Sequence, residues 1–441
     1  MTLDEYIEVT YQNNPLWFED EVTKPYNVAR ISNVIANRDY LAGRHKVLNR
    51  EDAVYKGKKF TTRKTILNYA RTVLSFHNTY LLGKPCSVVG DEEVTKTFTD
   101  IYKLGQYETV DYEILDRVNK FGDAYEVVYV ENGTIKSKIL DSGDCYPVYD
   151  DLGNYLAFIE HYTDAYSNIS YYNVYYDSCV EHWNNDGATL HLTNTDVNVC
   201  GLPIHYHNFN DMDYNFGESL LADIKPLLDD LEDILSKMGD AIYVNSLSPM
   251  NVALGQRIES TIPADAVGYV LNLDAGDYKV VSTVMDFNTI KLYLDNIKQM
   301  LNDISCIPSV LGSGNVANIS EISLKMLFHM ASIKAMETEK WLNVGFSKRF
   351  DKFRDILGKM NIPCNGYASV EYNLSIPVAT DEVVNNLKTM REIGAISLES
   401  VMEKSDLIKD VSIEKDRLCK EVKPNESVIK PNDNVIDEDK K

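Results

Sequence analysis

The chain has 441 residues, of which 44% are hydrophobic and 25% charged, proportions typical of a globular protein with about two or three domains. Its 67 acidic and 44 basic side chains give a formal net charge of −23, which argues against a protein that grips nucleic acid by neutralising phosphates. The seven cysteines are scattered without a C-x-x-C pair, which indicates reduced thiols and excludes a disulfide framework or a zinc site.

Residues 1–115 are predicted to be mostly helical. Within them, the segment 61–83 places apolar residues at helical intervals from Ile66 onwards. Gly83 and Pro85 are expected to end this helix, because neither residue favours its continuation.

From about residue 120 to 210 the pattern changes to strands. Tyr125, Val127 and Tyr129 occupy alternate positions, and Asn132-Gly133 has the composition of a tight hairpin turn. Further short apolar runs follow at regular spacing. The segment therefore predicts an antiparallel meander.

One pair of histidines in this segment has metal-ligand character. His205 and His207 lie on the same face of an expected strand and are followed by Asp211 and Asp213. The two acids fall in no recognised metal pattern, so we interpret the group as the end of an ordinary strand.

From residue 216 the spacing of the apolar residues changes to that of a helix. Apolar residues recur at 3.6-residue spacing from Leu220 to Met238, with Pro226 expected to kink this helix or to mark the start of its regular part. The acidic residues between them, Glu232 included, are expected to lie off the apolar stripe. We interpret this acidic run as a solvated helix face rather than a two-metal cluster.

Strands and turns are expected again over 245–285, and a second amphipathic helix over 288–304, ended by Pro308. A long helix is predicted from Ser320 to Leu357, which would span nearly 60 Å if unbroken, at roughly 1.5 Å per residue. A short strand and a helical region over 380–419 complete the pattern.

Between these helices, residues 309–319 read SVLGSGNVANI, and the run from Gly312 to Ala317 formally satisfies G-x-G-x-x-G/A. That motif binds a dinucleotide only where it follows a buried strand. Here a helix comes before it, and the G-K-[ST] ending of a P-loop is missing. The pattern therefore predicts a connection between helices and no nucleotide site.

The order of these elements is itself informative. Two amphipathic helices lead out to a small module and back, and each has one apolar stripe and one polar face. Such a helical pair leaves its sides exposed, so that neighbouring copies could pack alongside it. Repeated head-to-tail contacts that close would produce a ring.

Several short motifs resemble those of a known family, the bacteriophage portal proteins, specifically the group from long-tailed phages of Gram-positive bacteria. Each motif alone is weak, but their order and spacing together are specific. They are Tyr40-Leu41-Ala42-Gly43 with His45, Asn68-Tyr69-Ala70, Tyr80-Leu81-Leu82-Gly83-Lys84-Pro85, Gly122-Asp123-Ala124-Tyr125-Glu126, Phe216-Gly217-Glu218-Ser219, Ile307-Pro308, Ile393-Gly394-Ala395-Ile396-Ser397 and Glu414.

The resemblance implies an α+β portal fold in a fixed order. Its parts would be the N-terminal part of the wing (1–215), stem helix 1 (216–241), the clip (242–287), stem helix 2 (288–308), the tunnel loop (309–319), the spine helix with the rest of the wing (320–378), the crown (379–419) and a disordered tail (420–441).

The resemblance also implies a function. Portal proteins form a dodecameric ring at one capsid vertex, through which double-stranded DNA is packaged and ejected. The ring docks the terminase large subunit and the head-tail adaptor, and it contacts the major capsid and scaffolding proteins. The family has no catalytic site and no cofactor, so we expect no enzyme activity and no metal. The alternatives are a metal-dependent nucleic-acid enzyme and a non-portal oligomeric scaffold.

Site residues follow from the same resemblance. The tunnel loop facing DNA would comprise Gly312, Ser313, Gly314, Asn315, Val316, Ala317 and Asn318. Lys291 and Lys298, on the polar side of the second stem helix, are candidates for lining the channel; a subunit–subunit ion pair or simple exposure is the alternative.

Location follows from the same sequence features. The absence of an apolar run at the N-terminus, or of any run of about 18 apolar residues, predicts neither a signal peptide nor a membrane helix. We therefore expect assembly in the host cytoplasm and a final place in the virion.

Overall fold

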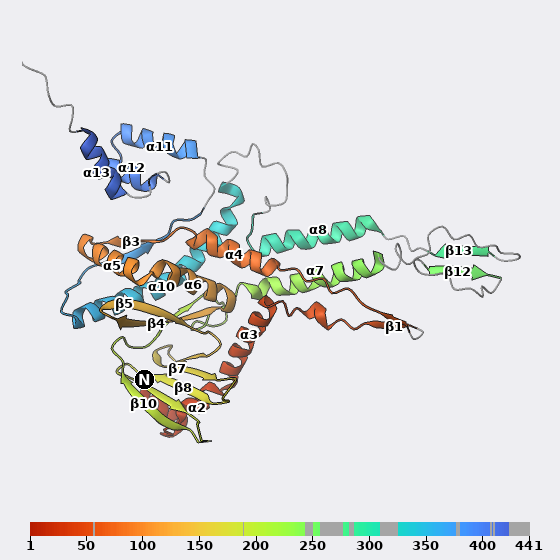
Figure 1. The fold of residues 1–441 in the computed structure, drawn as a ribbon, viewed down its shortest axis with the longest axis horizontal. Helices are drawn as coiled ribbons and strands as arrows, with labels where there is room; N and C mark the ends of the chain where they lie inside the picture. The colour runs from red at the N-terminus through yellow and green to blue at the C-terminus, as the bar shows by residue number, and fades with distance from the viewer. Residues whose placement is uncertain are drawn as a thin grey trace, which may run out of the picture. The chain divides into compact units, whose positions relative to one another are not determined.

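The computed structural model describes residues 1–55, 58–187, 189–242, 250–255, 277–281, 286–308, 325–375, 380–405, 408 and 411–422. The chain divides into two compact units, one of Met1–Asn318 with Lys325–Ser375 and one of Ile319–Leu324 with Ile376–Lys441. Most helices of the first unit and its two larger antiparallel sheets come from separate stretches of the chain (Figure 1), which confirms the predicted α+β class.

The chain up to Phe121 is mostly helical, as predicted. Its elements are α1 (Leu3–Tyr11), α2 (Trp17–Val22), α3 (Pro25–Leu41), η1 (Lys46–Asn49), the strands β1 (Ala53–Tyr55), β2 (Lys58–Phe60) and β3 (Ser87–Gly90), and the helices α4 (Tyr69–Leu82), α5 (Glu92–Gly105) and α6 (Tyr107–Phe121). Ile66 was predicted to lie in the helix that became α4, which was wrong. Residues 61–67 have no regular secondary structure, and the part from 63 to 67 lies along another helix, described below.

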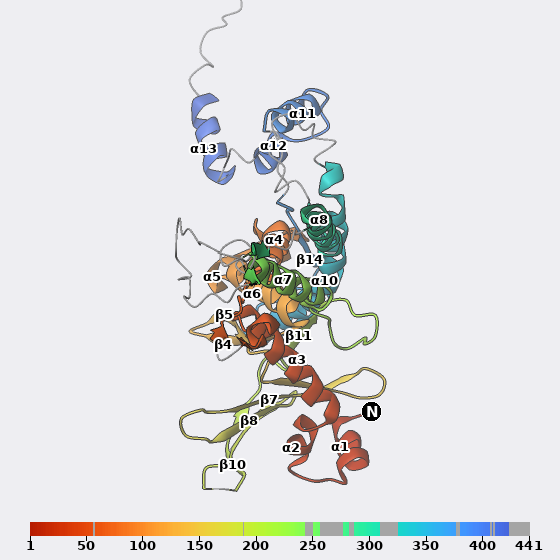
Figure 2. The same cartoon turned by 90° about the vertical axis from the view of Figure 1, so that its right-hand side faces the viewer.

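The predicted meander is confirmed from Cys145 to Val197 as a five-stranded antiparallel sheet in the order β10-β9-β8-β7-β6, whereas the hairpin at its start belongs to a separate sheet. Its strands are β6 (Cys145–Tyr149), β7 (Tyr155–Thr163), β8 (Ser170–Tyr175), β9 (Cys179–Asn184) and β10 (His191–Val197). Helices α1 and α2 cover one face (Figure 2), where Trp17 and Phe18 pack against Ala157, Ile159 and Val174.

A second, three-stranded sheet has the order β11-β4-β5, with β4 (Asp123–Glu131), β5 (Thr134–Leu140) and β11 (Ile204–His207). The β4–β5 hairpin turns at Asn132 and Gly133, both with positive φ, which confirms the predicted turn. Strand β11 closes the sheet from far along the chain, pairing His205 with Tyr125.

The core of the first unit forms around the long helix α10 (His329–Lys359), which crosses β11 and strand β14 (Ala368–Glu371). Phe350 and Phe353 pack against Phe98 of α5. Gly345 passes close to β11, since a Cβ there would lie 2.1 Å from the ring of Tyr206. Strand β14 pairs with β3 as an antiparallel two-stranded sheet.

The long helix is shorter than predicted. Residues 325–327 are helical, but Phe328 forms a turn with φ −87° and ψ 1°, and α10 begins only at His329. Its 31 residues span roughly 46 Å rather than 60 Å. The ring of Phe328 stacks on Tyr80 of α4, which anchors the turn in place.

The second unit contains the predicted C-terminal helices, α11 (Thr380–Glu392), α12 (Leu398–Lys404) and α13 (Val411–Val422). Ser397 caps α12, because its side chain accepts the N–H of Ser400. Helix α13 extends to Val422, beyond the predicted end of the helical region at residue 419.

Candidate functional site

Two antiparallel helices, α7 (Leu221–Ile242) and α8 (Phe287–Ile304), lie side by side (Figure 1) and form the candidate site. Both match their predicted ranges closely. Pro226 lies inside α7, which begins five residues earlier, so the proline does not mark the start of the helix. The pair β12 (Met250–Leu254) and β13 (Asp277–Val281) separates the two helices in the chain.

The base of the pair is fixed by an apolar cluster with the wing helices. Its buried members are Tyr40, Ala70, Val73, Leu74, Leu221, Ile224, Leu228 and Leu301. They come from α3, α4, α7 and α8, so that burial of this cluster ties both helices to the rest of the unit.

Two of the short sequence motifs meet where α7 begins. The O–H of Ser219 is donated to the carbonyl of Lys120, and the N–H of Gly217 is donated to Asp123, 2.9 Å away. The two backbones touch, since a Cβ on Gly122 would lie 2.3 Å from the carbonyl oxygen of Gly217. Glycine is required at this crossing, and at Gly122 the φ of +90° requires it as well.

Helix α8 leaves much of its apolar surface uncovered. Only Ile297 and Leu301 are buried in it, whereas Tyr293 and Ile304, predicted for the same stripe, are 46% and 48% exposed. Leu292 and Met300 are also exposed. Its partner α7 therefore covers only part of the apolar arc of α8.

On the other side of α7 lies an extended segment, residues 63–67, which we call the arm. Three of its backbone N–H groups are donated to α7 side chains: Leu67 to Glu232 at 2.7 Å, Thr65 to Ser236 at 2.9 Å and Arg63 to Asp240 at 2.8 Å. Every second residue of the arm thus meets every fourth residue of the helix. Polar acceptors at four-residue spacing beside an apolar stripe were the available sequence signal, and it was missed.

Glu232 corrects the interpretation of the acidic run as a solvated face. It is fully buried, because it continues the inward-facing line from Leu228, and it accepts a hydrogen bond from His45 Nδ1 at 2.7 Å. The His45 ring stacks on Tyr40 with centroids 4.0 Å apart. The Asp230 side of the run is exposed, as predicted.

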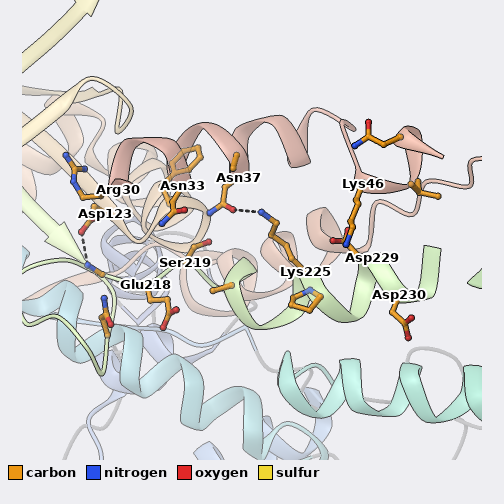
Figure 3. Close-up of a pocket in the computed structure, with 18 of the residues that line it drawn as sticks. Arg30, Asn33, Asn37, Lys46, Asp123, Glu218, Ser219, Lys225, Asp229 and Asp230 are labelled. Carbon is orange, nitrogen blue, oxygen red and sulfur yellow. Dashed lines mark hydrogen bonds between the residues drawn. The ribbon is translucent and has the colours of Figure 1, made fainter. Parts of the chain in front are cut away.

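A groove of about 1140 Å³ runs between α3, η1 and α7 (Figure 3). Its lining mixes both signs of charge, with Arg30, Lys46, Arg50 and Lys225 beside Asp123, Glu218, Asp229, Asp230 and Asp233. Lys225 donates to the side chain of Asn37, which bridges the groove from α7 to α3. The size and charge suit a macromolecular surface better than a small apolar ligand.

The predicted tunnel loop, Gly312 to Asn318, lies outside the described residues. Lys291 and Lys298 are exposed on α8, and neither has an ion-pair partner in the described part of the chain. Their place in a channel stays a prediction.

His205 has structural partners. Its Nε2 is 2.9 Å from Asp123 and its Nδ1 is 2.7 Å from the hydroxyl of Tyr149. Burial lowers its pKa to about 4. His207, Asp211 and Asp213 do not join it, and the described segments contain no group of three or more His, Cys, Asp or Glu placed to hold a metal ion.

Sequence reasoning also missed a buried charge network in the wing. Arg349 of α10 lies between Asp111 and Glu126, with its Nε 3.0 Å from Glu126, and all three side chains are almost completely buried. Burial raises the pKa of Asp111. The partners lie more than 200 positions away in sequence, so no local pattern marks them.

Within the described part of the chain, no helix combines the length and the apolar character that a membrane span requires.

Comparison with known proteins gives one extensive match. A family model described as "Phage portal protein, SPP1 Gp6-like" matches residues 22–426. No curated protein sequence matches. Similar solved structures include the neck of an empty gene transfer agent particle (13% identity, 74% of this chain, 86% of that chain, TM-score 0.45) and the virion of a native gene transfer agent particle (13%, 75%, 87%, TM-score 0.44). Because the family model covers most of the chain, this protein belongs to the SPP1 Gp6-like family of phage portal proteins.

Proposed function

We propose that twelve copies of this chain close into a ring at one vertex of a phage capsid, and that double-stranded DNA passes through its axial channel during packaging and ejection. Family membership supports the portal role. The observation that carries the assembly is α8, whose apolar arc is only partly covered within one copy.

The exposed arc has the chemistry of a subunit contact. Tyr293 and Met300 are 46% and 44% exposed on one side of α8, away from the apolar cluster that holds the helix through Leu301. Apolar side chains gathered on one side of a helix favour a protein partner over water. When a contact joins two different faces of identical copies, each copy can bind the next one head to tail. The addition of copies then stops when the last copy binds the first and the ring is closed.

The charge of the chain suits a conduit. A net charge of −23 repels phosphates, so DNA would slide without being held. Residues 309–319 would form the tunnel loop at the inner rim, because they connect α8 to the helical residues before α10. Glycines 312 and 314 give this loop conformational freedom at small steric cost.

In this role the chain is a structural platform and not the motor. The part between α7 and α8 would act as the clip that docks the terminase large subunit and later the head-tail adaptor, while the outer parts would contact the major capsid and scaffolding proteins. The ring would assemble in the host cytoplasm and remain in the virion. The short motifs support an origin in a long-tailed phage of Gram-positive bacteria.

Negative-stain images of the purified chain test the proposal. We expect rings of twelve with an axial hole. Rings without a hole would leave a non-portal scaffold as the better description, and absence of rings at every concentration would contradict the proposal.

The loop is tested separately. Replacing Gly312 and Gly314 with Leu should leave ring assembly intact and reduce the amount of packaged DNA. Unchanged packaging would argue against a tunnel loop at residues 309–319.

A further inference from the structure

Six exposed charges on the paired helices have no ion-pair partner among the described residues. Two of them, Asp295 and Asp303 of α8, have no like charge seven residues away, and the other four form two pairs. Asp223 and Asp230 lie on α7, and Lys291 and Lys298 lie on α8. Both pairs are seven residues apart, which puts each pair on one side of its helix with about 10 Å between its members. Exposed charges often pair with neighbours in a helix, so two matched sets without partners need an explanation.

The two sets lie on opposite sides of the helical pair. The Tyr293 hydroxyl donates to Asp230 at 2.9 Å, so these two residues mark one side. Each residue turns a helix by about 100°, which places Lys291 roughly 200° from Tyr293, and Lys298 roughly 200° from Met300. We call the side with Asp223 and Asp230 the acidic side, and the side with Lys291 and Lys298 the basic side. The exposed Asp295 lies within about 60° of both lysines, so the two lysines outnumber the acidic residue on the basic side by one.

We infer that the acidic side of the α7–α8 pair binds the basic side of the same pair in a second copy. This inference rests on the proposed ring, and it names the surface that closes it. The opposite signs of charge select a head-to-tail contact between copies, because two acidic or two basic sides would repel each other.

The heights of the charges agree with such a contact. Neighbouring copies in a ring are related by a rotation about the ring axis, with no shift along it. If the helices run along that axis, residues at the same position along the axis therefore face each other in neighbouring copies. The Tyr293–Asp230 hydrogen bond sets the heights, and in an antiparallel pair Lys291 then lies about two residues, or roughly 3 Å, from the level of Asp230. Lys298 lies at the same offset from Asp223. Both gaps are within the reach of a lysine side chain.

Exposed apolar groups on the acidic side would add to the contact. Tyr293 and Met300 lie beside the two aspartates and are 46% and 44% exposed. Their burial against a second copy would stabilise the ring without depending on salt, whereas the ion pairs would weaken as salt screens them.

Charge reversal tests the inference on the full-length chain. Lys291→Glu with Lys298→Glu should raise the concentration at which half of the chain is in rings by on the order of tenfold, since two exposed ion pairs become repulsions. Asp223→Lys with Asp230→Lys should do the same. The variant that combines all four changes should recover most of the assembly, as measured by light scattering and negative-stain imaging.

A matched control uses Lys96→Glu with Lys103→Glu, two exposed lysines of α5 with the same seven-residue spacing, which should leave assembly unchanged. If wild-type rings form and both reversals assemble normally, the inference is wrong while the proposed ring stands. Normal assembly with altered packaging in the lysine reversal would place those lysines in the channel instead. If the wild-type chain forms no rings, the proposed function itself fails.

Discussion

Arg349 is the largest fully buried side chain in the described part of the protein, and it forms ion pairs with two carboxylates, those of Asp111 and Glu126. A buried charge of this kind costs much desolvation, which only its partners offset. Tyr206 donates a further hydrogen bond to Glu126 at 2.6 Å, so the network joins α10, α6, β4 and β11. It fixes how the long helix crosses the small sheet.

Arg349→Met should therefore destabilise the first unit by about 3–5 kcal/mol, because Asp111 and Glu126 would remain buried without a cation. The free energy of unfolding from urea titration measures this. Adding Asp111→Asn and Glu126→Gln to the same variant removes the uncompensated charges and should restore part of the loss. Equal stability of Arg349→Met and wild type would mean that the network is solvated.

His205 gives the unit a dependence on pH. Its folded pKa of about 4 lies below its ordinary value, so at acid pH the unfolded chain binds the extra proton. The contribution of neutral, buried His205 to the free energy of unfolding is therefore fully present above about pH 6.5. It is lost as the pH falls towards 4, which lowers the free energy of unfolding by up to roughly 3 kcal/mol.

Urea midpoints of wild type and His205→Gln between pH 7 and pH 4.5 measure this contribution. The variant should be less stable at pH 7 but should lose less of its stability on acidification. Parallel pH profiles for the two proteins would assign the acid sensitivity to other groups, such as His77, whose pKa burial also lowers.

At the scale of elements, local sequence patterns predicted the helices and turns that depend on residues close together in the chain. The 3.6-residue spacing located α7 and α8, and Asn132-Gly133 located the β4–β5 turn. Alternation shows that a residue lies in a strand but not which strand it pairs with, so the division into two sheets and the distant partner β11 were not predicted.

The candidate site shows the same limit. Glu232 was predicted to lie on the surface because it is charged. Its burial depends on His45, which lies 187 positions away in the sequence and is therefore invisible to a local pattern. The exposed arc of α8 was also hidden from the sequence, because periodicity marks an apolar face without saying how much of it a neighbour covers.

The arm makes a direct test of these long-range contacts possible. Ser236→Ala removes the acceptor for the N–H of Thr65, which should lower stability by about 1 kcal/mol and speed the hydrogen exchange of that amide. Lys237→Ala, at the next and exposed position of α7, is the control and should change neither. Unchanged exchange at Thr65 would show that the arm is not held by α7.

At the scale of the whole molecule, the two units differ in what stabilises them. The apolar clusters described above and the Arg349 network lie in the first unit. The second unit has fewer buried groups among its described residues, Leu387 and Met402. The first unit should therefore fold without the second.

A chain ending at Ser375 should keep a cooperative thermal transition, with a Tm within about 3 °C of that of the full chain. Circular dichroism and calorimetry measure both. A chain ending at Gly345, which removes Arg349 and Phe350 from α10, is the control and should not fold. Loss of cooperativity in the longer chain would mean that the C-terminal helices complete the core.

The hydrogen bonds between the arm and α7 set a limit on their own length. Two extended residues advance about 6.7 Å, while four helical residues advance about 6.0 Å, so the two chains drift apart by roughly 0.7 Å at each step. The side chains at 232, 236 and 240 absorb two such steps, and each further step would add to the mismatch. The last bond lies at Asp240, two residues before α7 ends at Ile242. The series of hydrogen bonds to the arm therefore ends where the helix itself ends.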